Sequence, residues 1–407
     1  MTNLSVSKRA INTPASAVRK LVPLADIAKE KGIKVYHVNI GQPDIPTPDE
    51  ILREFRHLKR KILEYAPSTG MPETRLAWST FYQNKGFDYA PEDIIVTSGG
   101  GEGLMFAFFA VADPGDELLV FEPFYTSYAI SAGMGNINLK PVTTHIKEGF
   151  HLPDRQTIQK AINQKTKGII ICNPNNPTGT VYTKKEIEMI AEVAVTHNLF
   201  IISDETYQEI VFEGQKVFPL TRFNQLKDRL IIVDSVSKRF NACGARIGCV
   251  VSKNKEVMSS ILRFAQGRLS VATVEQLAVI NLLKNHQKYV EKVRRIYASR
   301  RNVVIKELRK IDGAKFIPSF GAFYIIVEIP VDNSDDFARF LLTDFSHNKE
   351  TVMISPAGGF YATPGLGRQE IRIAYVLEEK KLKRAIKLLG LALEKYNEYI
   401  RVRPSTH

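Results

Sequence analysis

The sequence is poor in cysteine and contains no long apolar run. Its 407 residues include three cysteines, Cys172, Cys243 and Cys249, an odd number without the CxxC spacing of a zinc site. No apolar run approaches the roughly 20 residues that a transmembrane helix needs. The first residues, MTNLSVSKRAINTP, also lack the apolar core of a secretion signal. We therefore expect no disulfide framework, no metal site and no membrane partner, and a cytoplasmic location.

Acidic residues are outnumbered, with 56 Lys and Arg against 43 Asp and Glu and a net charge of +13. The basic residues are spread along the chain, and no basic run is interleaved with stacking aromatics or carries a nucleic-acid reader motif. We expect no nucleic-acid partner. The positive field instead favours a ligand that carries phosphate or carboxylate groups.

Short apolar runs bounded by turn residues recur from Ile94 onward: IIVTSGG, ELLVFEP, GIIICNPNNP, FIISDETY, LIIVDSVS and IGCVVS. They are short and continuously apolar, which is typical of buried strands in a mainly parallel sheet. Helical patterns such as residues 184–198 lie between them, so we predict an α/β fold. We expect residues 45–285 to form a large domain, residues 286–407 a smaller α+β domain, and residues 1–44 a segment that packs with the smaller domain.

Polar residues follow several of these runs, and ligands bind at the carboxyl ends of strands in open α/β sheets. Gly99, Gly100 and Gly101 lie at a predicted helix start, where backbone N–H groups favour a phosphate. A flexible turn is the alternative, because the glycines match no standard phosphate motif. Asp204 would be a buried carboxylate that needs donors or a cation, unless it caps a helix. Asn176 in NPNNPTG could serve only a tight turn.

Lys238 lies just beyond LIIVDSVS, and Arg246 follows in the same small-residue loop. A surface lysine is the alternative, since most lysines are solvated. Pyridoxal phosphate suits a site in which the strands of one sheet end in a lysine, an acid, a tyrosine, a glycine turn and an arginine. Its aldehyde needs a lysine for a Schiff base, its ring nitrogen needs a carboxylate, and its phosphate needs N–H groups and a guanidinium.

The sequence resembles the class I aminotransferases of pyridoxal-phosphate fold type I, in the aspartate aminotransferase-like branch. The resemblance rests on SVSKRFNACGARIG, NPNNPTG, DETY, GQPDIPTP and GAFY, which follow the family's order along nearly the whole chain. It implies a large domain built on a mainly parallel seven-stranded sheet, a smaller α+β domain, and pyridoxal 5'-phosphate as cofactor. It also implies a homodimer with composite active sites.

The resemblance gives several residues a role around the cofactor ring. Lys238 would hold the cofactor as a Schiff base and, once displaced, move the proton at the substrate α-carbon. Asp204 would pair with the ring nitrogen. Tyr207 and Asn176 would donate to the ring hydroxyl oxygen, and Tyr125 would stack on the ring.

It gives a second group a role at the phosphate. Gly100 and Gly101 would offer backbone N–H groups, and Ser235 and Arg246 would add side-chain donors. Tyr65, in EYAPSTGMPETR, would reach the phosphate from the neighbouring subunit.

Substrate contacts are implied for Arg372, Gly41 and Asn176. Arg372 in EIRIAY would clamp the α-carboxylate, since a guanidinium can bind it through two parallel hydrogen bonds. An exposed strand arginine is the alternative. Aspartate-preferring members commonly carry a lysine where this chain has Gly101, which puts a strict aspartate preference in doubt. Arg268 could replace that cation or simply be solvated.

The resemblance implies an enzyme that moves an amino group between an L-amino acid and a 2-oxo acid by a ping-pong mechanism, with aspartate or a broader set of donors. A C–S lyase acting by β-elimination is an alternative on the same fold, because fold does not fix function. A non-catalytic regulator is a third hypothesis, but regulators of that kind carry an added DNA-binding domain, and nothing before IGQPDIPTP is long enough for one.

Overall fold

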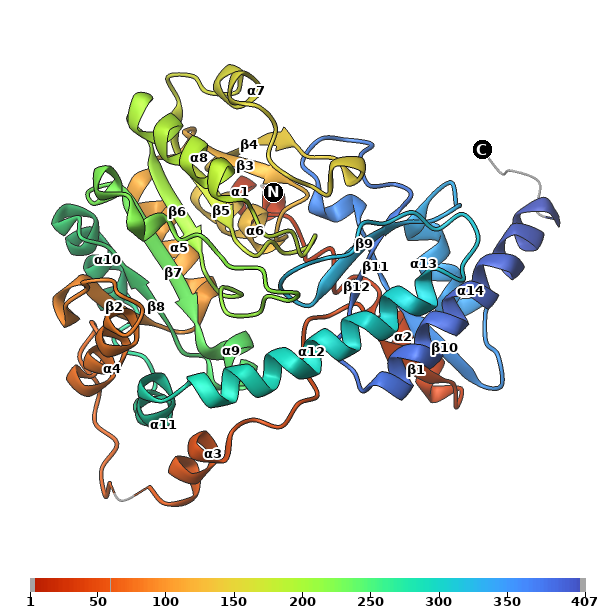
Figure 1. Ribbon diagram of the computed structural model, residues 1–407, viewed down its shortest axis with the longest axis horizontal. Helices are drawn as coiled ribbons and strands as arrows, with labels where there is room; N and C mark the ends of the chain where they lie inside the picture. The colour runs from red at the N-terminus through yellow and green to blue at the C-terminus, as the bar shows by residue number, and fades with distance from the viewer. Residues whose placement is uncertain (1–3, 59, 403–407) are drawn as a thin grey trace.

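A seven-stranded sheet lies at the centre of the larger part of the protein (Figure 1). This computed structural model describes residues 4–58 and 60–402. The strands follow the order β2-β8-β7-β6-β5-β3-β4. Neighbours are parallel except where β8 pairs with β2 and β7, which confirms the predicted mainly parallel α/β fold. The strands are β2 (Ile94–Thr97), β3 (Glu117–Glu122), β4 (Asn138–Thr143), β5 (Thr166–Cys172), β6 (Phe200–Asp204), β7 (Leu230–Ser235) and β8 (Gly248–Val251).

Helices cover both faces of this sheet, which explains why its strands are apolar at consecutive positions. In β5, Ile169 and Ile171 belong to the buried cluster under one set of helices, and Ile170 belongs to the cluster under the other set. The first set is α4 (Pro72–Gln83), α8 (Lys184–Thr196) and α11 (Thr273–Lys284), and the second is α5 (Gly100–Val111), α6 (Ser127–Gly135) and α10 (Lys255–Gly267). We call the sheet and these helices the large unit.

Shorter helices connect the strands of the large unit. The capping box at the start of α8 shows how local sequence sets a boundary: the Thr183 hydroxyl accepts from Glu186 N, and the Glu186 carboxylate accepts from Thr183 N. The short α-helices are α3 (Asp49–Arg56), α7 (Arg155–Lys160) and α9 (Val236–Arg239). The 3-10 helices are η1 (Pro91–Asp93), η2 (Ile146–Glu148), η3 (Leu220–Arg222), η4 (Asn224–Leu226) and η5 (Cys243–Ala245).

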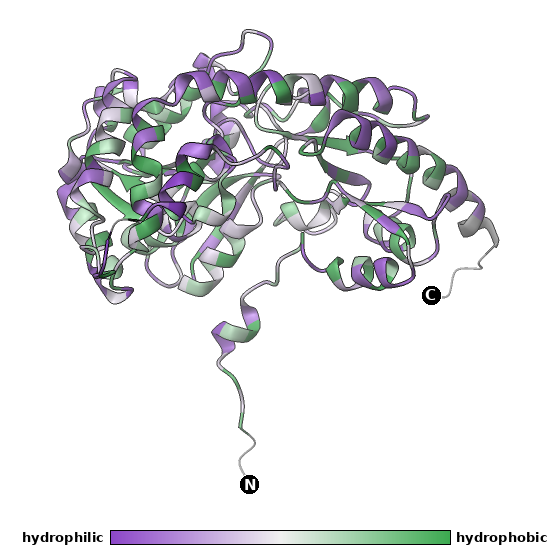
Figure 2. Cartoon of the chain, turned by 90° about the horizontal axis from the view of Figure 1, so that it is seen from below, coloured by the Kyte–Doolittle hydropathy of each residue, from purple (hydrophilic) through white to green (hydrophobic). Residues whose placement is uncertain are grey.

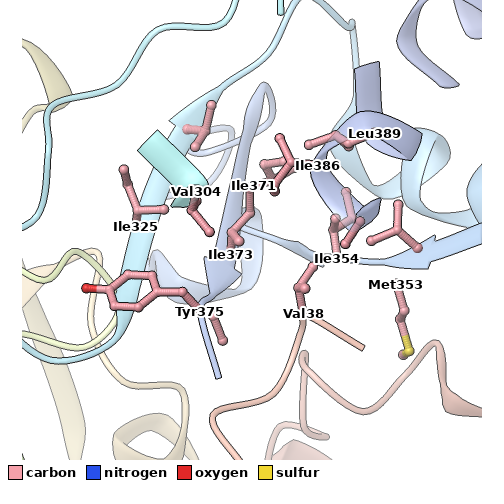
Figure 3. Packing of buried hydrophobic residues seen from close by; sticks show 14 of the residues in the cluster. Val38, Val304, Ile325, Met353, Ile354, Ile371, Ile373, Tyr375, Ile386 and Leu389 are labelled. Carbon is pink, nitrogen blue, oxygen red and sulfur yellow. The ribbon is translucent and has the colours of Figure 1, made fainter. Parts of the chain in front are cut away.

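A second, smaller unit lies beside the first and has its own core (Figure 3). It contains an antiparallel sheet of order β11-β12-β9 and a parallel pair of β1 with β10. Its strands are β1 (Lys34–His37), β9 (Tyr324–Glu328), β10 (Glu350–Met353), β11 (Ser355–Pro356) and β12 (Glu370–Ala374), and its helices are α2 (Val22–Glu30), α12 (Gln287–Leu308), α13 (Ser334–Thr343), η6 (Gly358–Phe360) and α14 (Glu379–Val402). We call these elements the small unit.

Two segments join the units or extend from them. Helix α12 runs from the sheet of the large unit to the small unit (Figure 1). Near the N-terminus, Leu21, Ala25 and Val38 are buried in the core of the small unit. Before them, an arm that contains α1 (Lys8–Asn12) extends from the body, with α1 beside α6 (Figure 2). Of the helices described, none is both long enough and apolar enough to cross a membrane.

Candidate active site

A cavity of about 150 Å³ lies where the strands of the large sheet end. It brings together most of the predicted site residues from the ends of β2, β5, β6 and β7. Its lining comprises Gly100, Gly101, Leu104, Tyr125, Asn176, Asp204, Thr206, Tyr207, Ser235, Ser237, Lys238, Cys243 and Arg246. A wider hollow of about 450 Å³ beside the start of α12 contains none of the predicted site residues. The smaller cavity is therefore the candidate active site.

Lys238 reaches this cavity from α9, a single helical turn directly after β7. The turn begins where the Ser235 hydroxyl accepts from Ser237 N at 3.1 Å. Lys238 Nζ donates to Gly41 O at 2.8 Å and lies 3.5 Å from Cys243 Sγ. Burial favours the neutral amine and by itself would lower the pKa of Lys238. The electrostatic effect of the nearby Tyr324, Cys243 and Tyr125 is larger, so the pKa is raised. The lysine is thus a partly buried donor inside the site rather than a surface charge.

Asp204, the last residue of β6, is a buried carboxylate that faces donors but no cation. Tyr128 OH donates to its Oδ2 at 2.8 Å, and Thr206 N donates to its Oδ1 at 3.2 Å. Among the residues that the structure describes, none forms a salt bridge with Asp204. Burial raises the pKa of Asp204, and the Thr206 and Tyr128 hydrogen bonds offset only part of that effect. The next helix after β6 is η3, which begins at Leu220, so Asp204 caps no helix and the helix-cap alternative is wrong.

The glycine turn after β2 opens helix α5. Gly99 has φ +78°, which favours glycine, and a Cβ there would come within 2.4 Å of the Arg246 guanidinium. Arg246 Nη2 donates to Ser98 O at 3.0 Å, and its Nη1 donates to Cys243 O at 3.1 Å. The free N–H groups of the first turn of α5 and a guanidinium are therefore neighbours, as an anion site requires.

The two consecutive asparagines of NPNNPTG have different hydrogen-bond partners. Asn175 builds the turn, because its Oδ1 accepts from Thr178 N and Oγ1 at 3.3 and 3.0 Å. Asn176 lines the cavity, and its Oδ1 accepts from Arg372 Nη1 at 3.0 Å. This hydrogen bond ties the end of β5 in the large unit to β12 in the small unit.

Arg372 is a buried cation with an unsatisfied donor. It is 3% exposed, and its guanidinium carbon lies 4.4 Å from the Tyr324 ring and 4.8 Å from the Phe360 ring. Its Nη2 donates to Asn39 O, but its Nε has no hydrogen-bond partner, and no carboxylate in residues 4–58 and 60–402 forms a salt bridge with it. Burial lowers its pKa. The expectation of an exposed strand arginine, kept as an alternative above, is wrong.

Three further predicted residues lie outside the cavity lining or next to it. Gly41 contributes its carbonyl oxygen to Lys238 Nζ. Tyr65 is 82% exposed and is not brought to the cavity within this chain. Arg268 is not a solvated arginine: its Nε lies 3.3 Å from Glu102 Oε2, and its Nη2 donates to Val96 O at 2.9 Å. Its guanidinium therefore faces a carboxylate of its own chain, while its Nε and Nη1 have no hydrogen-bond partner.

Comparison with known proteins agrees with this geometry. The family described as aminotransferase class I and II matches residues 33–389. The chain belongs to this family. An aspartate aminotransferase of Pyrococcus horikoshii is 31% identical over 396 residues, which cover 96% of this chain and 97% of that protein.

Other aminotransferases show the same fold and a different substrate. The structure of the Thermus thermophilus aspartate aminotransferase with maleate superimposes with a TM-score of 0.87 at 29% identity, over 96% of this chain and 100% of that one. A (5-formylfuran-3-yl)methyl phosphate transaminase of Methanocaldococcus jannaschii is 31% identical over 96% of this chain and 100% of that protein. The family and the fold are thus shown, while similarity at this level spans more than one substrate.

Sequence reasoning missed several side chains of this aminotransferase site. Tyr128, in EPFYTSY, donates to Asp204, and Tyr324, in GAFY, exchanges a hydrogen bond with Tyr207 OH at 2.9 Å. Cys243 lines the cavity beside Lys238. A signal existed for Tyr128, which lies one helical turn after Tyr125, but the 117 residues between Tyr207 and Tyr324 hide their contact.

Proposed function

We propose that this aminotransferase uses pyridoxal 5'-phosphate to move an amino group between an L-amino acid and a 2-oxo acid in two half-reactions, with Lys238 as the catalytic residue. One observation carries the proposal: two buried charges of the described chain lack an opposite charge, the Asp204 carboxylate, which lines the cavity that holds Lys238, and the Arg372 guanidinium, which donates to the lining residue Asn176. Unpaired buried charges are costly unless a ligand supplies their partners. A ligand with a cationic ring nitrogen and a substrate carboxylate would supply both.

The donor set around the cavity fits this cofactor. When bound, pyridoxal phosphate supplies an aldehyde that condenses with amines and a cationic ring that withdraws electrons from the substrate α-carbon. Asp204 would accept a hydrogen bond from the ring nitrogen and keep it protonated. Tyr207 and Asn176 would donate to the ring hydroxyl oxygen, and Tyr125 would pack against the ring face.

The phosphate would lie at the start of α5. The Gly100 and Gly101 N–H groups point along the helix axis there, where the helix dipole favours an anion. The Ser235 hydroxyl and the Arg246 guanidinium complete the set, because both line the same cavity. Holding the phosphate fixes the ring relative to Lys238.

Lys238 would carry the proton. Its Nζ, once neutral, would take the proton from the substrate α-carbon and later deliver it to the cofactor carbon C4′, on the far side of the nitrogen. Arg372 would hold the substrate α-carboxylate through two parallel hydrogen bonds, with its free Nε directed to the ligand, and Gly41 would lie next to that carboxylate. The fixed carboxylate orients the α-hydrogen toward Lys238.

For the substrate, we propose a set of donors broader than aspartate alone. A cation for a second carboxylate is missing at Gly101, and Arg268 is engaged with Glu102. The Pyrococcus relative is named an aspartate aminotransferase, whereas the Methanocaldococcus relative is named for a phosphate-bearing aldehyde. Neutral and aromatic amino acids are therefore proposed as donors alongside aspartate.

We further propose a homodimer with composite sites. The phenol of Tyr65 and the apolar side chains of Ile62 and Leu63 are exposed in one chain, at 82%, 72% and 61%. The arm before α2 also presents exposed Leu4 and Ile11. A second copy would cover these groups and bring Tyr65 to the phosphate. The division into residues 1–44, 45–285 and 286–407 is proposed with it, because the two clusters around the large sheet come mainly from residues 45–285 and most of the third cluster comes from residues 21–38 and 293–396. Four residues of the large segment, Cys172, Tyr207, Ile210 and Phe212, also pack into that third cluster, where the two units meet.

The test is a half-reaction panel. Each amino acid is mixed with the holoenzyme without an oxo acid, and the absorbance change of the bound cofactor is recorded. We expect responses from several donors in the native protein and none in Lys238→Ala. Release of pyruvate from cystathionine without an added oxo acid would instead support the C–S lyase. An unchanged turnover in Lys238→Ala would refute the proposal.

A further inference from the structure

A buried ion cluster lies directly behind the candidate active site, and the proposed reaction does not use it. Arg239 follows Lys238 on α9, and its side chain is 1% exposed. Its Nη2 donates to Asp234 Oδ2 at 2.8 Å, and its Nε forms an ion pair with Glu209. The Phe81 ring lies 4.5 Å from the guanidinium carbon. Two carboxylates and an aromatic ring therefore fix this side chain.

The two carboxylates come from separate parts of the large unit. Asp234 belongs to β7, and its Oδ1 accepts from Ser235 N at 2.6 Å. Glu209 lies beyond β6, and its other oxygen contacts His286 Nε2 at 3.0 Å and Lys85 Nζ at 3.5 Å. Arg239 thus connects the single turn of α9 to β7, to the segment after β6, and to the residue before α12.

Helix α9 needs such a connection to hold its orientation. It has four residues, and one helical turn is not stable through its own hydrogen bonds. The Ser235 hydroxyl holds its second residue, Ser237, and the Arg239 ion pairs hold its last. Successive side chains leave a helix about 100° apart, so Lys238 enters the cavity while Arg239 enters the protein interior. A rotation that moves Lys238 Nζ must break the Arg239 ion pairs.

We propose that Arg239 is a positioning residue for Lys238: its ion pairs with Asp234 and Glu209 fix the rotation of α9 and so the place of Lys238 Nζ during proton transfer. The inference rests on the role proposed for Lys238. Lysine at position 239 keeps the charge but lacks the planar fork that reaches both carboxylates. The substitution should therefore slow the proton transfer, because a misplacement of the reacting group by about 1 Å strongly lowers its rate.

The experiment places Arg239→Lys in two backgrounds. In the holoenzyme with Lys238 intact, we expect kcat to fall at least about tenfold and KM to change by less than about twofold. In Lys238→Ala, added methylamine serves as the base and restores part of the activity. In that background, adding Arg239→Lys should change the methylamine-dependent rate by less than about twofold. A double-mutant cycle of this kind isolates an effect that acts through Lys238.

Arg301→Lys is the matched control. Arg301 is also buried, pairs with Glu213, and lies 5.3 Å from the Phe320 ring, but it belongs to α12, and neither of these partners belongs to α9. Arg301→Lys should lower the melting temperature, but it should change the rate by the same factor in the protein with Lys238 intact and in Lys238→Ala. Glu209→Gln, which removes one of the two ion pairs, replaces Arg239→Lys should that variant not fold. An equal loss in both backgrounds, or no loss in either, overturns the inference. Amine-independent turnover by Lys238→Ala refutes the proposed function instead.

Discussion

Asp204 has a stability effect that is separate from catalysis. Burial raises its pKa, so the ionised carboxylate destabilises the cofactor-free protein at neutral pH. Asparagine removes the charge and still accepts from Tyr128. We expect Asp204→Asn to raise the unfolding free energy of the cofactor-free protein by about 1 kcal/mol or more, and to lower kcat/KM of the holoenzyme by at least about 10²-fold. Thermal denaturation and steady-state kinetics measure the two effects.

Asp234→Asn is the contrasting control for this prediction. Asp234 is fully buried like Asp204, but it has Arg239 as a partner at 2.8 Å. Asp234→Asn leaves the buried Arg239 guanidinium with Glu209 as its one remaining carboxylate among these two partners, so we expect a loss of stability that is smaller than the ~3–5 kcal/mol for a buried charge left without any partner. The two asparagine variants should therefore shift the melting temperature in opposite directions. A lower melting temperature for Asp204→Asn would show that its carboxylate is already well paired.

Glu205 gives the protein a pH-dependent stability. Burial raises its pKa from 4.5 to about 7, the nearby Asp234 charge adds to the rise, and Lys85 and Arg239 oppose it. The folded state therefore holds this proton more tightly than the unfolded state. Its contribution to the unfolding free energy is complete below pH 4.5 and is lost as the pH rises through about 7.

Glu205→Gln tests this contribution, because glutamine does not titrate. We expect denaturant unfolding of the native protein to lose stability between about pH 4.5 and 7, and the variant to lose less over the same range. At pH 8 the variant should be the more stable of the two. Parallel pH profiles for the two proteins would contradict the assignment to Glu205.

Two glycines at the start of α5, Gly99 and Gly101, differ in the space that a side chain would have. A Cβ at Gly99 would strike the Arg246 guanidinium, whereas a Cβ at Gly101 would meet nothing within 4 Å. A side chain at position 101 can thus be added without moving the turn. Because Arg268 is occupied by Glu102, a lysine there would be the new cation beside the cavity.

Gly101→Lys should therefore change the choice of substrate rather than the fold. We expect kcat/KM for aspartate to rise relative to that for alanine by about tenfold, the effect of one added charge-assisted hydrogen bond. The measurement is the ratio of the two kcat/KM values in the native protein and the variant. Gly101→Ala is the control, since it adds a side chain without charge and should leave the ratio unchanged.

At the level of elements, the sequence predicts the strand ends better than the contacts between them. Asp204 and Lys238 each follow an apolar run that is buried on both faces, so their place at the edge of the sheet was predictable. The Tyr128–Asp204 and Arg372–Asn176 hydrogen bonds join residues 76 and 196 positions apart. Such contacts depend on tertiary packing, which no local pattern encodes. The pairing of Arg268 with Glu102 was hidden for the same reason.

For the whole molecule, the proposed composite site makes a prediction about mixed dimers. Lys238→Ala would abolish activity at both sites of its homodimer. Tyr65→Ala would impair both sites of its homodimer by weakening phosphate binding. In a mixed dimer, one site carries both defects and the other carries neither, since Tyr65 acts across the interface. We expect refolding the two variants together to restore activity above that of either one alone.

A doubly substituted chain is the control for this mixing experiment. When Lys238→Ala and Tyr65→Ala are on one chain and are mixed with a chain that carries Lys238→Ala, every site lacks the lysine and activity should stay at background. Activity that does not rise in the first mixture would place Tyr65 in its own subunit's site or outside any site.

The pairing of β1 with β10 sets an order for folding during synthesis. Residue 34 lies opposite residue 350, and the core that encloses this pair also includes α14. The sheet of the large unit is complete once residue 251 has left the ribosome, so the lysine-bearing turn can form early. The small unit, and with it Arg372, must wait for the last helices. A ribosome-bound chain would therefore form the proposed phosphate site before the proposed site for the substrate carboxylate.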